Sequence, residues 1–282
     1  MSRCALWHGD CLDVMATLDA GSVDAIVTDP PYAEISRDYG RLTESAWHTL
    51  MDGVVEQARR VLKPTGSAVF VLQANQARVG SMRPWLYEFV AKWARQWNVV
   101  QDAYWWNFSA PPTVHCHRTR GLMRPSVKLC VWLGAPDCYR NQDAVLWEPS
   151  EATKHADRAD RALTRLPSGQ SMRRGRCCAA SDERGGVTPF NLIPIANANS
   201  ASSAGAHGHG AGTPLDLCRW WVRYLTPPGG LVLDPFTGSG TTGVACALEG
   251  MRFVGIEQVE EYADMAMQRL RAVRKAQREA VK

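Results

Sequence analysis

The chain has 282 residues, enough for one large domain or for one domain that carries an insertion. Its composition, 45% hydrophobic and 21% charged, is that of a soluble globular protein, and no apolar run is long enough to span a membrane. A net charge of +4 is too small to indicate a nucleic-acid partner by itself.

Nine cysteines are scattered along the chain, and no two of them form a Cys-x-x-Cys motif. No signal peptide is evident, so free thiols in a reducing cytoplasm are the simplest interpretation. Two histidine-containing stretches, 115–117 and 207–209, lack further ligands at zinc spacing. We therefore expect a cytoplasmic protein without a bound metal.

The amino-terminal part begins with a strand, a helix and a second strand. Short apolar runs at 3–7 and 23–29 read as strands, and residues 11–18 between them carry apolar side chains at helical spacing. This order of short elements is typical of a parallel sheet.

Asp29-Pro30-Pro31-Tyr32 follows the second strand directly. The two prolines end the strand and stiffen the chain, so a carboxylate, a carbonyl oxygen and an aromatic ring are presented at one end of the sheet. Ligands of open α/β sheets bind at the carboxyl ends of the strands. Taken alone, the four residues are explained equally well as a strand-ending turn.

The following elements continue the alternation of helices and strands. A polar loop at 33–42 lies beside Tyr32, where it could act as a mobile flap over the site. The tryptophans of two clusters, in 84–96 and in 104–106, are interpreted as core residues. The patterns predict helices at 43–62 and 84–96 and strands at 67–72, 98–108 and 127–133.

A basic segment comes next. Between His115 and Arg184 there are 13 Lys and Arg against 8 Asp and Glu, an excess of +5 that leaves −1 for the remainder. This excess suits a surface that faces a polyanion, and a solvated insertion is the alternative. Residues 151–166 read as a basic helix, and 196–212 read as a flexible linker of small residues.

A glycine-rich loop dominates the carboxyl-terminal part. It follows a predicted helix at 215–225 and a strand at 231–233, and it precedes a helix at 242–249, a strand at 252–256 and a helix at 259–278. The loop and the start of its helix consist of Asp234, Pro235, Phe236, Thr237, Gly238, Ser239, Gly240, Thr241 and Thr242.

This layout is typical of a nucleotide-type cofactor site. Glycines let the backbone approach a ligand, the helix start offers N–H groups to an anion, and Glu257 stands where a ribose hydroxyl is bound. The glycine spacing fits neither the dinucleotide fingerprint nor a P-loop, so the expected anion is a carboxylate, as in S-adenosylmethionine, with Phe236 packed on its adenosine or methionine part. A turn that only packs a helix on the sheet is the alternative.

The two motifs together resemble the amino-methyltransferases of DNA, and their order, with Asp29-Pro30-Pro31-Tyr32 before the glycine loop, resembles the β class of these enzymes. Residues 9–15 resemble the opening motif of the class, which places Asp10 and Cys11 near the adenine of S-adenosylmethionine, and 255–257 resemble its ribose-binding motif.

The resemblance implies an α/β, Rossmann-like methyltransferase fold with a mostly parallel twisted sheet, helices on both faces and a circularly permuted motif order. It divides the chain into a catalytic half at 1–140, a basic target-recognition insert with a linker at 141–212, and a cofactor-binding half at 213–282. The strands that end at Asp29 and Asp234 should then be neighbours, with both loops at the same edge of the sheet.

One position departs from the family pattern. Thr213 stands where a lysine is typical, and a threonine can give the cofactor carboxylate only a neutral hydrogen bond, roughly half as strong as a charge-assisted one. We expect weaker cofactor binding or help from another cation.

The activity implied is transfer of a methyl group to the N6 amine of a flipped adenine at a specific sequence in double-stranded DNA. Asp29 and the Pro30 carbonyl, in the stiff loop with Pro31, would accept hydrogen bonds from the amine, and Tyr32 would stack on the base. Asp29 is also expected among the residues that contact the cofactor. The basic segment would read the target through Arg118, Arg120, Arg124, Arg173, Arg174 and Arg176.

Two alternatives stay open. The family includes N4-cytosine enzymes, although Asp29 favours adenine because cytosine enzymes more often have Ser there. A methyltransferase-like DNA-binding module without chemistry is the second, and Thr213 is its best support. Methylation of a protein glutamine fits less well, because it expects Asn first and an upstream cofactor loop. A homodimer and a cognate restriction endonuclease are partners that the sequence leaves open.

Overall fold

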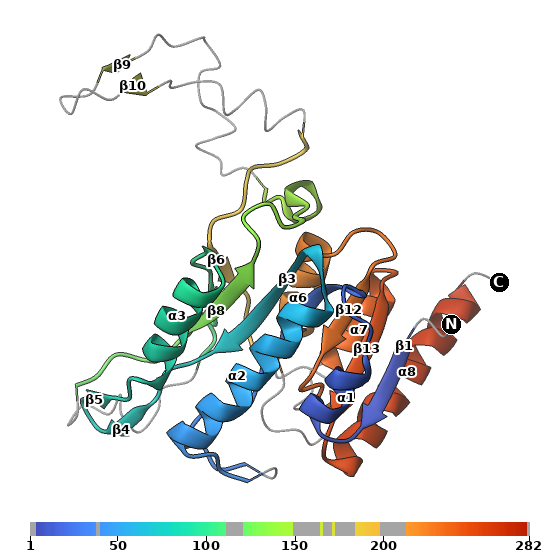
Figure 1. Ribbon diagram of the computed structural model, residues 1–282. Helices are drawn as coiled ribbons and strands as arrows, with labels where there is room; N and C mark the ends of the chain where they lie inside the picture. Colours follow the sequence, from blue (N-terminus) through green and yellow to red (C-terminus); the bar gives the residue numbers. More distant parts are fainter. Residues whose placement is uncertain are drawn as a thin grey trace. The chain divides into compact units, whose positions relative to one another are not determined.

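The computed structural model of the chain describes residues 4–37, 40–110, 121–148, 164–165, 171–172, 184–197 and 213–280. They divide into two compact units, of which the larger comprises Met1–Arg140 and Asn191–Lys282 and the smaller comprises Asn141–Phe190. The larger unit contains a mixed sheet of nine strands (Figure 1).

The sheet has the strand order β1-β13-β12-β2-β3-β8-β7-β11, and β6 also pairs with β8. The five strands from β1 to β3 in this order are mutually parallel, whereas β8 runs antiparallel to β3, β6 and β7. The strands are β1 (Cys4–His8), β2 (Val23–Thr28), β3 (Leu62–Leu72), β6 (Val99–Gln101), β7 (Tyr104–Trp106), β8 (Val127–Gly134), β11 (Leu192–Pro194), β12 (Leu231–Asp234) and β13 (Arg252–Glu257).

Helices cover both faces of the sheet (Figure 1). One layer consists of α1 (Cys11–Thr17), α2 (Glu44–Val61) and α3 (Trp85–Gln96), and the other of α6 (Leu215–Leu225), α7 (Thr241–Leu248) and α8 (Glu260–Ala280). The prediction of a largely parallel sheet between two helical layers is confirmed. None of the helices in the described part of the chain is long and apolar enough to cross a membrane.

The central pair of strands brings the two sequence motifs together. Strands β2 and β12 are parallel neighbours, with Ala25 opposite Val232 and Ile26 opposite Leu233. Asp29 therefore follows β2 at the edge where Asp234 ends β12. The predicted adjacency of these strands is confirmed, and it explains how motifs about 200 residues apart in the sequence form one site.

Tryptophans form much of the core beside this edge. Trp47, Trp85 and Trp93 are buried on α2 and α3, and the Trp47 indole Nε1–H donates to the Pro31 carbonyl at 2.6 Å. Trp47 thus packs in the core and also holds the loop after β2 through this hydrogen bond. The core interpretation is confirmed for Trp85 and Trp93. Trp105 is buried but lines a cavity, and the interpretation is wrong for Trp106, which is 40% exposed.

The sequence did not predict how the strands after α3 are divided. The single strand expected at 98–108 is two short strands, β6 and β7, because Asp102 leaves the ladder and accepts hydrogen bonds from the Asn191 side chain at its carbonyl and its carboxylate. A hairpin of β4 (Gln76–Arg78) and β5 (Ser81–Met82) and the strand β11 were also not predicted.

The smaller unit has a 3-10 helix, η2 (Gln142–Val145), and an antiparallel pair, β9 (Thr164–Arg165) with β10 (Ser171–Met172). The Arg184 guanidinium donates to Asp143 and Gln142 at 2.7 Å each, and the rings of Trp147 and Phe190 are 5.3 Å apart. The helix expected at 151–166 is wrong at 164–165, and its other residues lie outside the described ones, as do 198–212 of the expected linker.

Candidate active site

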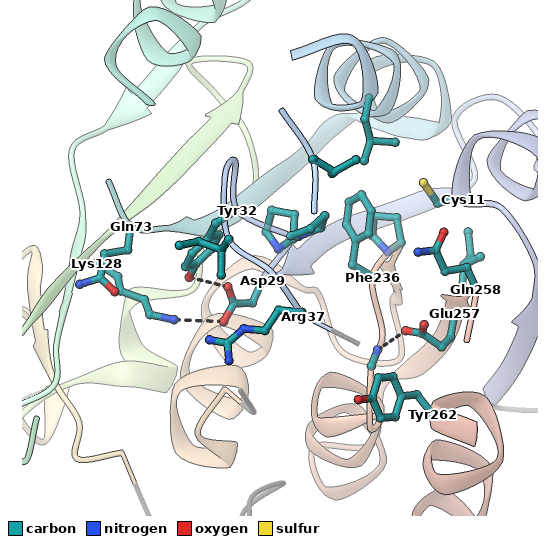
Figure 2. Close-up of a pocket in the computed structure, with 18 of the residues that line it drawn as sticks. Cys11, Asp29, Tyr32, Arg37, Gln73, Lys128, Phe236, Glu257, Gln258 and Tyr262 are labelled. Carbon is teal, nitrogen blue, oxygen red and sulfur yellow. Dashed lines mark hydrogen bonds and ion pairs between the residues drawn. The ribbon is translucent and has the colours of Figure 1, made fainter. Parts of the chain in front are cut away.

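A cavity of about 600 Å³ lies at the carboxyl edge of β1, β2, β12 and β13. Figure 2 shows Asp29 and Tyr32 near its middle, Lys128 at one end, and Glu257 and Tyr262 at the other. Ten of the residues predicted for the site line it: Asp10, Cys11, Asp29, Pro30, Pro31, Tyr32, Pro235, Phe236, Gly238 and Glu257. Its size is that of a site for a small-molecule ligand.

The Asp29 carboxylate is the best-connected acidic group in this cavity. Its Oδ1 accepts the Tyr32 hydroxyl at 2.7 Å, and its Oδ2 accepts the Thr213 hydroxyl at 2.6 Å. The Lys128 ammonium lies 3.3 Å from the same Oδ2. Two hydroxyl groups and one cation therefore orient this carboxylate before any ligand arrives.

Thr213 has a different neighbour from the one expected. It was predicted to contact the cofactor, but it lies behind Asp29 beside a small pocket lined by Thr28, Val71 and Trp221, and it does not line the main cavity. Its hydroxyl donates to the Asp29 carboxylate instead. Thr213 thus supplies a short neutral donor to Asp29.

The loop that follows Tyr32 is held from both sides. The Asn75 side-chain amide donates to the Ala33 carbonyl at 2.6 Å, and Asn75 in turn accepts the Trp85 indole N–H at 3.1 Å. Glu34 forms an ion pair with Arg41 and accepts the Glu44 amide N–H at 3.2 Å. These bonds tie the loop to Asn75 on one side and to the first residue of α2 on the other.

The glycine loop after β12 is held by close packing and by one arginine. Gly240 has φ +84°, and a Cβ there would lie 2.8 Å from the Ala266 Cβ, so only glycine fits this turn into α7. The Arg269 guanidinium donates to the Ser239 carbonyl at 2.6 Å, to its hydroxyl at 3.0 Å and to the Thr241 hydroxyl at 3.2 Å. Burial lowers the pKa of Arg269 from its ordinary value.

Glu257 links the glycine loop to the end of β13. Its Oε2 accepts the Gly238 amide N–H at 2.7 Å, its Oε1 accepts the Val259 amide N–H at 2.9 Å, and the residue is 8% exposed. Each carboxylate oxygen has a second lone pair, so the group can accept hydroxyl hydrogens from a ligand while it holds the loop.

Asp10 and Cys11 begin α1 at the same end of the cavity. Asp10 is the N-cap, and its Oδ1 accepts the Leu12 N–H at 2.8 Å and the Asp13 N–H at 3.3 Å. Burial, with a smaller effect of the nearby Asp10 charge, raises the pKa of Cys11 to about 12. The thiol therefore stays protonated and contributes packing surface.

Asp234 is buried at the junction of the two motifs and does not line the cavity. Burial raises the pKa of its carboxyl to about 6, against the opposing effect of the donors Thr28 Oγ1 at 2.6 Å and the Phe236 N–H at 3.1 Å. Among the predicted cofactor residues, Thr237, Ser239, Gly240, Thr241 and Thr242 likewise do not line the cavity.

Asp234 should make stability depend on pH. The pKa of Asp234 in the folded chain lies above the ordinary value of 3.8. The protonated carboxyl therefore contributes its full stabilisation below pH 3.8, and this stabilisation is lost as the pH rises through about 6. Between pH 5 and 7.5 the free energy of unfolding of the wild type should fall by roughly 1 kcal/mol relative to Asp234→Asn. Urea denaturation of both proteins at several pH values measures this difference, and parallel pH curves would contradict it.

Several cavity residues were not predicted. Lys128 and Trp105 come from β8 and β7, Arg37 from the loop after β2, and Gln258 and Tyr262 follow β13. Gln258 had a signal in the sequence, because it directly follows a strand that was predicted to end at the ligand edge, whereas Tyr262 lies in the first turn of α8. Lys128 had none, because a lone lysine at the start of an apolar run is common.

The proposed DNA contacts are only partly described. The Arg124 guanidinium donates to the Ala110 carbonyl at 3.1 Å, next to the cavity-lining residues Pro125 and Ser126. The other five, Arg118, Arg120, Arg173, Arg174 and Arg176, lie outside the described residues, as do 115–117, 207 and 209. Within the described ranges no three His, Cys, Asp or Glu side chains form a group that could hold a metal ion.

Comparison with known proteins places this site in a family context. A family model described as DNA methylase matches residues 23–268. The Type II methyltransferase M.PvuII from Proteus hauseri is 26% identical, with 93% of this chain and 82% of that protein covered. The DNA adenine methyltransferase YhdJ from Escherichia coli K12 is 25% identical, with 93% of this chain and 81% of that protein covered.

Solved structures show the same fold. The PvuII DNA methyltransferase, described as cytosine-N4-specific, has a TM-score of 0.72 at 21% identity, over 95% of this chain and 86% of that chain. The M1.HpyAVI–SAM complex has a TM-score of 0.57 at 20% identity, over 95% of this chain and 98% of that chain. The predicted Rossmann-like methyltransferase fold is confirmed.

Proposed function

The chain belongs to the N6/N4 DNA methylase family, and from this premise we propose that it methylates the N6 amine of a flipped adenine in double-stranded DNA. One observation carries the proposal. Asp29, after β2, and the glycine loop, after the neighbouring β12, contribute to a single cavity. An amine acceptor and a cofactor loop are thereby brought to the same place.

S-adenosylmethionine is the cofactor of this family, and when bound it supplies an electrophilic methyl group. The residues at the Glu257 end of the cavity have the chemistry to hold it. The Glu257 carboxylate can accept ribose hydroxyl hydrogens, and Phe236 and Tyr262 offer aromatic surfaces to an adenosine. Gly238 has no side chain and leaves its backbone accessible to the ligand.

Asp29 and Pro30 act on the target amine. The lone pair of an exocyclic amine is delocalised into its ring, so the amine becomes nucleophilic only when its N–H groups are held and turned. The Asp29 carboxylate and the Pro30 carbonyl are the two acceptors, and the negative charge of Asp29 stabilises the positive charge that develops on nitrogen. Tyr32 supplies a stacking surface, worth ~1–3 kcal/mol for one base.

Adenine is favoured over cytosine by the first residue of the catalytic motif. In this family an aspartate at the position of Asp29 is typical of adenine enzymes, whereas serine is more common in cytosine enzymes. N4 of cytosine is the second candidate, because the PvuII enzyme with its TM-score of 0.72 is described as cytosine-N4-specific. YhdJ, at 25% identity, is described as an adenine enzyme.

We also propose that arginines of the basic segment bind the DNA around the flipped base. Arg124 lies beside the cavity-lining Pro125, which supports a contact near the flipped nucleotide. Arg118, Arg120, Arg173, Arg174 and Arg176 are proposed on charge alone.

DNA from cells that express the chain should carry N6-methyladenine in one sequence context. Methylation-aware sequencing gives the context, and mass spectrometry of the nucleosides identifies the modified base. Cells that express Asp29→Ala at the same level are the matched control and should lack the mark. N4-methylcytosine in its place would select the second candidate. Absence of any mark, with DNA bound but S-adenosylmethionine not bound in calorimetry, would indicate a binding module.

A further inference from the structure

We propose that, in the protein without DNA, the Lys128 ammonium occupies the position of the target amine, and that the incoming base must displace it from Asp29. The inference rests on the proposed function and adds a residue that controls entry of the base. Lys128 lies at the end of the cavity opposite Glu257, on the far side of Asp29 (Figure 2).

The Lys128 ammonium makes the two contacts that a flipped base would need, one with Asp29 and one with the ring of Tyr32. Its Nζ lies 3.3 Å from Asp29 Oδ2, so it donates to the acceptor that the amine needs. The same Nζ lies over two aromatic rings, 5.2 Å from the centroid of Tyr32 and 4.9 Å from that of Trp105. A base that stacks on Tyr32 and donates to Asp29 therefore competes with the ammonium for both contacts.

Strand direction explains why a lysine from β8 is found here. Because β8 runs antiparallel to β3, Leu129 pairs with Leu72 and the amino end of β8 lies at the carboxyl edge of the parallel strands. On the other side Lys128 pairs with Trp105 in β7. The backbone of Lys128 is thus held by the ladder with β7, and that of the next residue also by the ladder with β3, while the long Lys128 side chain, 21% exposed, can turn away from Asp29.

The chemistry of the reaction requires this displacement. Positive charge develops on the amine nitrogen during methyl transfer, and a cation that remained at Asp29 would oppose it. DNA brings phosphates that can accept the displaced ammonium. The hydroxyl groups of Tyr32 and Thr213 continue to hold Asp29 when the lysine leaves, so the carboxylate keeps its orientation.

The test measures base extrusion directly. A duplex with the recognition sequence keeps the unmodified target base and carries the fluorescent base 2-aminopurine next to it. The fluorescence of 2-aminopurine rises when its neighbour is extruded, and protein is added to saturation. Lys128→Met keeps the length of the side chain but not its charge. In this variant the ratio of extruded to unextruded target base should rise about three- to tenfold over the wild type. Lys128→Arg retains a cation and should stay at or below the wild-type level.

Lys92→Met is the matched control elsewhere in the chain. Lys92 also pairs with a carboxylate, Asp52 at 2.6 Å, and also lies over an aromatic ring, Trp93 at 5.2 Å, but it does not line the cavity. This variant should leave extrusion unchanged. Thermal unfolding and S-adenosylmethionine affinity, which should match the wild type, show that each variant is folded.

An extruded fraction that falls or stays equal in Lys128→Met would overturn the inference, since it would mean that the ammonium assists the base or is irrelevant to it. Failure of the proposed function has a different signature. In that case the wild type itself neither methylates nor extrudes a base in any duplex. If the wild type methylates DNA and Lys128→Met extrudes the base to the same extent as the wild type, only the role of Lys128 is refuted.

Discussion

Replacing Asp29 with alanine should lower the rate of methyl transfer about a thousandfold at saturating DNA and S-adenosylmethionine. The variant removes the acceptor that turns the amine lone pair and the charge that stabilises the developing cation. It also leaves the Tyr32 and Thr213 hydroxyls and the Lys128 ammonium without their shared partner. Single-turnover kinetics with a duplex of known recognition sequence measures the rate.

Asp29→Asn separates charge from shape. The amide keeps an oxygen that can accept one hydroxyl, but it loses the negative charge, so we expect an intermediate loss of about a hundredfold. Cofactor affinity should stay close to that of the wild type in both variants, because Asp29 lies away from the Glu257 end of the cavity (Figure 2). A variant that weakens cofactor binding and spares the rate at saturation would show that Asp29 has another role.

The geometry of Asp29 and Asp234 could be predicted because local chemistry marks the ends of strands. Prolines follow Asp29 and Asp234, and apolar runs precede both, so the ends of β2 and β12 were evident in the sequence. Parallel strands connected by helices end at one edge. The adjacency of the two strands followed from the family resemblance, and the register of Ile26 with Leu233 confirms it.

The contribution of Lys128 could not be predicted, because it depends on the direction of a strand. In a fully parallel sheet the start of β8 would lie at the edge opposite the cavity. The reversal of β8 brings Lys128 to Asp29, and no local pattern in Val127–Gly134 encodes that reversal. Thr213 is similar, since its proximity to Asp29 arises from two segments 184 residues apart.

The sequence pattern did not predict that the strand expected at 98–108 is split into β6 and β7, and the reason is local. The run Tyr104-Trp105-Trp106 outweighed the polar Asp102 in the hydrophobic pattern. In the structure Asp102 interrupts the strand, and β6 and β7 each pair with β8. Gln101 pairs with Trp132 and Tyr104 with Leu129, so the register with β8 is the same on both sides of the break, and Trp105 stands opposite Lys128.

Glu257 should control cofactor affinity, whereas Asp29 controls rate. Glu257→Gln is expected to weaken S-adenosylmethionine binding about ten- to a hundredfold, because hydrogen bonds to a charged group contribute about 1.5–3 kcal/mol and the amide offers only one accepting atom. The rate at saturating cofactor should change little, since Glu257 lies at the far end of the cavity from Lys128 (Figure 2). Calorimetry measures the affinity and single-turnover kinetics the rate.

Glu257 also holds the loop, so two explanations of a weaker affinity must be separated. The amide nitrogen of glutamine cannot accept a hydrogen bond, so the variant must lose the bond from either Gly238 or Val259 as well as the charge. If only the loop were affected, the cofactor-free protein would be destabilised and Ser239→Ala, which removes one Arg269 contact from the same loop, would weaken binding similarly. If the carboxylate itself binds the ribose hydroxyls, the loss of affinity in Glu257→Gln should exceed that of Ser239→Ala and should shrink for a cofactor analogue that lacks those hydroxyls. An equal loss for both cofactors would assign Glu257 to loop support alone.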